Sequence, residues 1–194
     1  MSAEPILVVV DMQHDFMEEG ALPTAEPSAM VEGLNAAMAA ARERGFTIVA
    51  TRDWHPADHE SFQKNGGIWP DHCVAGSPGA EFHPGLRFPE SVIVISKGSE
   101  REGMGYSPFE NPAMVDLVRS HVGATVYVTG VALEYCVRAT CLDSLAYGGR
   151  PVAVLPLIRA VSRDETVLKG VEEELAAAGV EYVSRVPPEL GGPA

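Results

Sequence analysis

The chain has 194 residues, of which 46% are hydrophobic, and this is enough for one domain with a substantial core. Acidic residues outnumber basic residues by 27 to 14, and the resulting net charge of −13 disfavours binding to the phosphate backbone of nucleic acids. No apolar run approaches the roughly 18 to 20 residues of a membrane span, and no signal-peptide pattern begins the chain. We therefore expect a cytoplasmic protein with no nucleic-acid or membrane partner, whose three cysteines are reduced.

Apolar runs alternate with helical patterns along the whole chain. The expected strands cover residues 6–10, 46–51, 92–96, 125–129, 152–155 and 181–184. The expected helices cover residues 27–44, 112–121, 136–147 and 164–178. This alternation predicts an α/β fold, a three-layer α/β/α sandwich around a mostly parallel six-stranded sheet, as one domain over residues 1–194.

One segment, residues 54–89, interrupts the alternation with proline, glycine and no helical period, and such long irregular segments are usually functional. At its start, Asp53 and His55 are two residues apart at a strand end, so their side chains are expected on the same side. His72 adds a second imidazole, and His59 lies between them in sequence. Two imidazoles and one carboxylate suit zinc, manganese or iron. Surface histidines in a polar loop are the alternative, and spacing alone does not decide between the two.

Ionisable or nucleophilic side chains stand at the ends of four expected strands, in Asp11, Asp53, Lys97 and Cys136. A parallel sheet brings these ends to one rim, where open α/β sheets bind ligands. Each residue alone has an ordinary explanation, such as a loop carboxylate or a solvated lysine. Together, a thiol, a carboxylate that can take its proton and an ammonium group are the parts of a nucleophilic amide hydrolase.

The segment from Thr129 to Cys136 is expected to pass from a strand through a tight turn into a helix. The thiol would then lie at or near the helix N-terminus, where unpaired N–H groups and the helix dipole lower a cysteine pKa and bind an oxyanion. Cys141, further along this helix, is expected to be a buried structural cysteine.

Longer motifs surround these residues. They are VVDMQHDF at 9–16, TRDWHP at 51–56, WPDHC at 69–73, KG at 97–98, YSPF at 106–109, VTGVA at 128–132 and YCV at 135–137. With these motifs the sequence resembles the nicotinamidase branch of the isochorismatase-like cysteine hydrolases over essentially its full length. The fold implied is the isochorismatase-like α/β/α sandwich.

The resemblance implies hydrolysis of nicotinamide, and also of pyrazinamide, to the acid and ammonia. In this scheme Cys136 attacks the carboxamide carbon and forms a thioester, Asp11 accepts the thiol proton, and Lys97 steadies the charge near both. The backbone N–H groups of Ala132 and Cys136 form the oxyanion hole, after a cis peptide between Val131 and Ala132.

The resemblance also implies one divalent transition metal, with zinc as first choice and iron or manganese as alternatives. Its ligands would be Asp53, His55 and His72, with His59 as a further candidate, and the metal would hold the ring nitrogen of a small heteroaromatic amide. The residues expected to contact this substrate are Phe16, Leu22, Trp69, Tyr106, Val131 and Tyr135. A homo-oligomer is compatible with this interpretation.

Other functions remain open from the sequence. Another amidase of the same superfamily would act on ureidoacrylate or an N-carbamoyl compound. A non-haem iron oxygenase would use two histidines and a carboxylate, but it has no need of Lys97 and Cys136 in this arrangement. A catalytically silent binding module would keep the fold and lose the thiol or its base, whereas Cys136 and Asp11 are both present.

Overall fold

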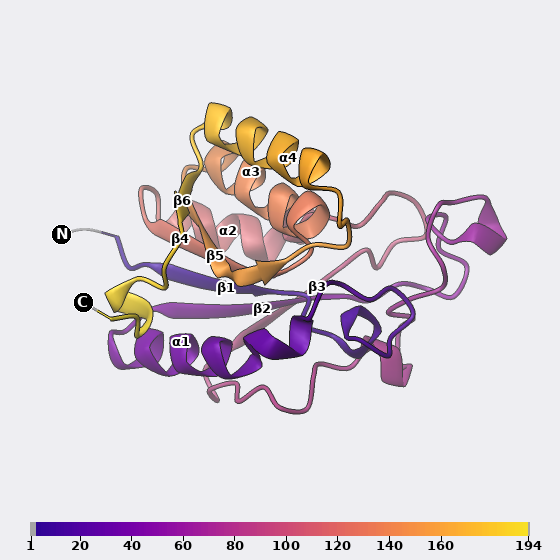
Figure 1. Cartoon of the computed structure of the whole chain (residues 1–194), viewed down its shortest axis with the longest axis horizontal. Coiled ribbons are helices and arrows are strands. Elements are labelled where there is room, and N and C mark those ends of the chain that lie inside the picture. The colour runs from indigo at the N-terminus through magenta and orange to yellow at the C-terminus, as the bar shows by residue number, and fades with distance from the viewer. Residues whose placement is uncertain (1–2, 194) are drawn as a thin grey trace.

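The computed structural model describes residues 3–193, and its six-stranded sheet lies between two layers of helices (Figure 1). The strands are β1 (Ile6–Val10), β2 (Thr47–Asp53), β3 (Ile93–Lys97), β4 (Thr125–Val131), β5 (Arg150–Arg159) and β6 (Glu181–Val183). The α-helices are α1 (Val31–Glu43), α2 (Pro112–Ser120), α3 (Arg138–Ala146) and α4 (Glu165–Ala178). Helix α1 covers one face of the sheet, and α2, α3 and α4 cover the other. The predicted α/β/α architecture is confirmed.

The strand order is β3-β2-β1-β4-β5-β6, and every neighbouring pair is parallel. All five residues of β1 are buried, as expected of a central parallel strand covered on both faces. The chain adds β2 and β3 on one side of β1 and β4 to β6 on the other, which makes the carboxyl ends of β1 and β4 a topological switch point. Ligand sites of open α/β sheets form at such a point.

Strands β1 and β4 approach each other closely at this switch point. Val10 pairs with Gly130, and a Cβ atom at Gly130 would lie 2.1 Å from the carbonyl oxygen of Val10. Gly130 also has a φ of +99°, which favours glycine. The end of β1 and the segment after β4 are therefore held side by side.

Helix α1 packs through one apolar face under the sheet. Leu34, Ala37, Met38 and Ala41 lie on this face, and each is buried. Burying a leucine or methionine side chain contributes about 1.5 to 3 kcal/mol. The predicted helix 27–44 is correct in extent, but its first turn, Pro27–Met30, is a 3-10 helix.

Two elements differ from the sequence prediction. Strand β5 is ten residues long, whereas the prediction ended at residue 155, because Pro156 lies within an irregularity of the β4–β5 pairing and does not end the strand. The predicted helix 136–147 begins earlier, with a π-helical turn, Leu133–Val137, before α3. Cys136 therefore lies within this initial π-helical turn, close to the helix N-terminus as predicted.

The irregular segments gather beyond the carboxyl ends of the strands, at the right of Figure 1. Segment 54–89 contains two short 3-10 helices, Gln63–Asn65 and Pro78–Ala80. Two isolated bridges, His55 with Val74 and Phe62 with Trp69, lie within the segment, and a third joins its Phe82 to Gln13. Across residues 3–193, none of the helices has the length and apolar character needed to cross a bilayer.

Candidate active site

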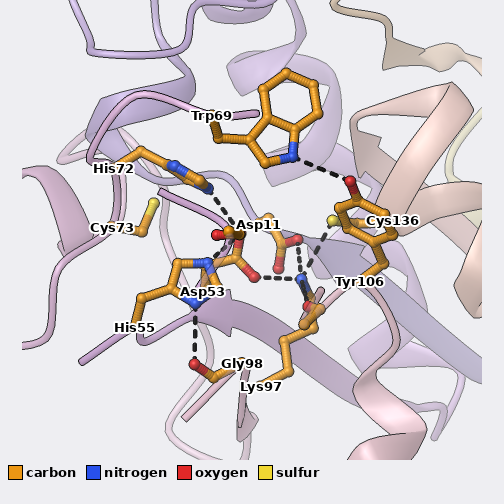
Figure 2. Close-up of polar contacts among 12 residues, drawn as sticks. Asp11, Asp53, His55, Trp69, His72, Cys73, Lys97, Gly98, Tyr106 and Cys136 are labelled. Atoms are coloured by element: carbon orange, nitrogen blue, oxygen red, sulfur yellow. Dashed lines mark hydrogen bonds and ion pairs between the residues drawn. The ribbon is translucent and has the colours of Figure 1, made fainter. Parts of the chain in front are cut away.

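Lys97, the last residue of β3, lies at the centre of a buried polar cluster (Figure 2). Its Nζ is 2.8 Å from Oδ2 of Asp11 and 3.2 Å from Sγ of Cys136, and it also pairs with Oδ1 of Asp53. It donates a further hydrogen bond of 3.0 Å to the carbonyl oxygen of Gly105. The structure thus brings together the four residues that the sequence placed at strand ends.

Asp11 follows β1 with a φ of +50°, a conformation uncommon outside glycine. Its backbone N–H donates to the carbonyl oxygen of Thr51, and the hydroxyl of Thr51 donates to Oδ1 of Asp11 at 2.6 Å. The side chain is fully buried. These bonds to β2 direct the carboxylate toward Lys97 and Cys136, so that a carboxylate oxygen of Asp11 lies within 4.8 Å of the thiol sulfur.

The protonation preferences of this cluster follow from burial and from Lys97. Burial raises the pKa of Asp11, against the opposing effect of Lys97. Burial alone would lower the pKa of Lys97, but Asp11 and Asp53 raise it well above its usual value. Lys97 is therefore a permanent ammonium group between two carboxyl groups and a thiol.

The expectation of a lowered cysteine pKa needs correction. Burial raises the pKa of Cys136 well above its usual value, and the carboxylates of Asp11 and Asp53 add to this, against the opposing effect of Lys97. The resting group is thus a thiol and requires a base within reach. Asp11 is the carboxylate positioned for that role.

Three side chains beside the cluster have the geometry of a metal site. Nε2 of His55 is 3.5 Å from Oδ2 of Asp53, and Nε2 of His72 is 3.9 Å from the same oxygen. All three ligand atoms lie within 4.8 Å of one another. Ligands about 2.1 Å from a tetrahedral zinc ion are about 3.4 Å apart, so the donor atoms fit a divalent metal ion with little movement.

The orientation of both imidazoles supports this fit. Nδ1 of His55 is 2.9 Å from the carbonyl oxygen of Gly98, and Nδ1 of His72 is 2.8 Å from that of Pro70. A carbonyl oxygen only accepts hydrogen bonds, so Nδ1 carries the proton in each ring and Nε2 keeps its lone pair for a metal. Lys97 and the imidazoles hold the pKa of Asp53 below its usual value although burial opposes this, which keeps its carboxylate ionised.

His59 lies beside these ligands without joining them. Its ring centroid is 4.2 Å from that of His55, and its side chain is fully buried. Burial lowers the pKa of His59 to about 4, so its imidazole is neutral. Its Nδ1 contacts Ser61, and it is not part of the set of ligand atoms within 4.8 Å.

A cavity of about 20 Å³ adjoins the thiol and two of the three candidate metal ligands, Asp53 and His72. It is lined by Phe16, Leu22, Asp53, Trp69, His72, Tyr106, Ala132, Tyr135, Cys136 and Val161. Five of the six residues predicted to contact the substrate are among them. Trp69 Nε1 donates a hydrogen bond of 3.0 Å to the hydroxyl of Tyr106, which closes the cavity on one side (Figure 2). A larger cavity of about 540 Å³ near His83 contains none of the predicted catalytic residues.

Val131 differs from the other predicted contact residues. Its side chain is fully buried in the hydrophobic core and is not among those that line the cavity. The peptide between Val131 and Ala132 is cis, as the resemblance implied, and Ala132 and Cys136 both border the cavity. In this segment Ala132 and Cys136, and not Val131, border the cavity.

Two polar residues that orient the site, Gln13 and Asp15, have contacts that the sequence does not predict. The buried side chain of Gln13 donates to the carbonyl oxygens of Asp53 and Ala80, at 2.8 and 2.9 Å, and accepts from the backbone N–H of Asp53 at 2.8 Å. Asp15 accepts from the backbone N–H of Cys73 at 2.7 Å. Both lie in the VVDMQHDF motif, which was the one available signal, but spacing could not assign their partners.

Comparison with known proteins places this architecture in a family. The isochorismatase domain family model matches residues 5–166. The nicotinamidase/pyrazinamidase of Mycobacterium tuberculosis is 35% identical over 185 residues, which cover 91% of this chain and 97% of the relative. Among solved structures, a pyrazinamidase of Pyrococcus horikoshii in complex with zinc is 41% identical, with a TM-score of 0.86 and coverage of 93% of this chain and 98% of that chain.

A second solved structure, of an L. infantum protein in complex with nicotinate, is 35% identical with a TM-score of 0.83. It covers 94% of this chain and 93% of that chain. The family model spans most of this chain, and these relatives share its fold over nearly their whole length. The chain belongs to the isochorismatase family.

Proposed function

We propose that the chain is a single-domain, metal-containing cysteine amidohydrolase that converts nicotinamide to nicotinate and ammonia, and that also accepts pyrazinamide. The observation that carries this proposal is the position of the Lys97 ammonium group, 2.8 Å from Asp11 and 3.2 Å from the Cys136 sulfur. The metal ligand set beside it supports a heteroaromatic amide over other amides of the superfamily.

In the first half of the reaction Asp11 accepts the proton of the Cys136 thiol as the sulfur attacks the carboxamide carbon. The carbonyl oxygen gains negative charge, and the backbone N–H groups of Ala132 and Cys136 are the proposed donors to it. The carbon–nitrogen bond then breaks while Asp11 returns the proton to the nitrogen, which leaves as ammonia. The product is a thioester between Cys136 and the nicotinoyl group.

In the second half a water molecule attacks the thioester carbon and gives a proton to Asp11. The carbon–sulfur bond breaks, Asp11 passes this proton to the Cys136 sulfur, and the acid leaves and gives up its remaining proton to solvent as nicotinate. Lys97 makes one carboxylate serve as base in both halves, because its ammonium group stabilises the ionised form of a fully buried Asp11. The raised pKa of the thiol makes this base necessary.

Asp53, His55 and His72 are the proposed ligands of the metal, and zinc is its proposed identity, since the P. horikoshii relative contains zinc. A metal ion held by these residues would supply a Lewis acid for the ring nitrogen of the substrate and would thereby orient the ring. Phe16, Trp69 and Tyr106 border the same cavity and supply apolar faces for a flat ring.

The proposal is tested by ammonia release from a panel of amides. Purified protein is incubated separately with nicotinamide, pyrazinamide, ureidoacrylate and N-carbamoylsarcosine, and initial rates are compared. We expect nicotinamide and pyrazinamide to be hydrolysed with the highest kcat/KM. A preference for either open-chain compound would assign the chain to a different amidase of the superfamily, and no turnover of any amide would favour a binding module.

A further inference from the structure

Three imidazoles lie in succession beside the Asp53 carboxylate, and one of them is oriented in the opposite sense. Ring centroids of His59 and His55 are 4.2 Å apart, and those of His55 and His72 are 5.0 Å apart. His55 and His72 each turn Nδ1 toward a carbonyl oxygen. His59 instead turns Nδ1 toward Ser61, whose backbone N–H and hydroxyl group can donate hydrogen bonds.

The partners of Nδ1 in His59 determine its tautomer. The backbone N–H of Ser61 points at this nitrogen over 3.2 Å, and the Ser61 hydroxyl lies 2.7 Å from it. A backbone N–H can only donate, so Nδ1 must present its lone pair. The proton of a neutral imidazole is then on Nε2. A nitrogen that carries a proton has no lone pair for a metal ion.

Nε2 of His59 is left with an unmet requirement. It is buried and has no hydrogen-bond partner among residues 3–193. The His59 ring packs against the His55 ring with centroids 4.2 Å apart, so Nε2 lies beside the imidazole cluster. Buried N–H groups in folded proteins are almost always paired with protein atoms or with ordered water. The acceptor for this group must therefore come from something held in the site.

We infer that His59 is not a ligand of the metal ion but presents an Nε2–H donor to a water molecule held in the metal site. This inference rests on the proposed function only in that a metal occupies the Asp53, His55 and His72 set. It separates two roles within one cluster: two imidazoles offer lone pairs, and the third offers a proton. His59 would thereby position a molecule in the site without contributing a bond to the metal.

The tautomers are measured by long-range proton–nitrogen NMR of protein labelled with ¹⁵N-histidine, first after treatment with chelator and then with one equivalent of Zn²⁺. We expect His59 to show a protonated Nε2 and an unprotonated Nδ1 in both samples. His55 and His72 should show protonated Nδ1, and their Nε2 signals should shift when Zn²⁺ is added. His59→Phe assigns the signals, since the protein has six histidines. A His59 Nε2 signal that shifts to the metal-bound position would overturn the inference.

Metal binding provides an independent measurement. X-ray absorption of the zinc-loaded protein should report two imidazoles in the wild type and also in His59→Phe, whereas His72→Phe should show one. Loss of a residue that contacts a metal site indirectly lowers metal affinity roughly 10- to 100-fold, and we expect this range for His59→Phe in a chelator competition. Three imidazoles in the wild type, falling to two in His59→Phe, would show that His59 is a ligand.

Ser61→Ala is the matched control. It removes the hydroxyl and keeps the backbone N–H that fixes the tautomer, so the His59 signals should keep their pattern; a changed tautomer would contradict the argument. Neither readout depends on catalysis. Nicotinamide hydrolysis is measured on the same zinc-loaded sample, so a failure of the proposed reaction is recognised separately from a failure of the His59 assignment.

Discussion

The rim of the sheet and segment 54–89 position their functional groups in two different ways. Asp53 and Lys97 are strand residues, paired in register on β2 and β3, and Asp11 follows β1 directly. Their backbones are fixed by the sheet. His55 and His72 lie in irregular chain, where single hydrogen bonds from Nδ1 to a carbonyl oxygen set the rings. Groups held by the sheet should tolerate changes around them, whereas groups held by individual contacts should not.

The largest expected effect comes from the nucleophile on the rim. Cys136→Ala should lower kcat for nicotinamide by roughly 10⁴-fold or more, because the covalent route is lost, while the sheet keeps the fold intact. Cys73→Ala and Cys141→Ala are the controls, since Lys97 has a hydrogen bond to the Cys136 sulfur and to neither of these two thiols among residues 3–193, and they should retain most activity. Steady-state kinetics with circular dichroism checks this, and an active Cys136→Ala would refute the assignment of the nucleophile.

Lys97→Met tests the electrostatic centre of the rim. It removes the ammonium group and leaves the buried carboxylates of Asp11 and Asp53 without a counter-charge, which should cost about 3 to 5 kcal/mol in the free energy of unfolding. The half-exposed pair of Lys64 with Asp71 offers a matched control, and Lys64→Met should cost less than about 1 kcal/mol. Urea unfolding of both variants measures the difference. Equal losses would mean that the buried pairs do not stabilise the rim.

Removal of the metal tests the contribution of segment 54–89 and not that of the rim of the sheet. A chelator should lower nicotinamide hydrolysis roughly 100-fold, the cost of a misplacement of about 1 Å, because the ring loses its anchor while the thiol and its base are unchanged. Benzamide has no ring nitrogen, so its slow hydrolysis should change little. Added Zn²⁺ should restore the rate with nicotinamide. Full activity of metal-free protein in chelator would remove the metal from the proposed function.

The smallest effect is expected where the two regions meet. Gln13→Glu keeps the shape of the side chain and its bond to the Asp53 N–H, but it replaces the donor that faces two carbonyl oxygens. We expect a loss of about 1 to 3 kcal/mol in stability and weaker metal binding. Gln63→Glu changes an exposed amide in the same way and should stay within about 0.5 kcal/mol. Thermal unfolding and chelator competition compare the two, and an unaffected Gln13→Glu would show that this contact does not fix Asp53.

The residues on the rim of the sheet could be predicted from the sequence because apolar runs show where strands end. Three of the apolar runs are followed closely by Asp11, Asp53 or Lys97, Cys136 follows a fourth after a turn, and parallel pairing brings such strand ends together. The same pattern does not show how deeply Cys136 is buried. The predicted lowering of its pKa was therefore wrong, because burial raises this pKa. The π-helical turn that contains Cys136 and the continuation of β5 past Pro156 depend on tertiary packing, which overrides local signals.

The segment was predictable only in its residue types. The sequence offered a carboxylate and three imidazoles, but the choice among histidines depends on which atom each Nδ1 meets. The bond from Gln13 to Asp53 spans 40 residues and leaves no periodic trace. Contacts between side chain and backbone at such separation have no sequence signature, so the groups that orient the site could be identified only in the folded chain.

The cavity beside Cys136 also decides which molecules can finish the reaction. Its volume of about 20 Å³ exceeds the roughly 10 to 15 Å³ that one water molecule needs, but a pyridine ring cannot enter until side chains such as Trp69 and Tyr106 move apart. At the size seen here, the space beside Cys136 admits a water molecule and not a bulky amine or alcohol. The side chains that line the cavity therefore exclude acyl acceptors larger than water, which favours hydrolysis over acyl transfer.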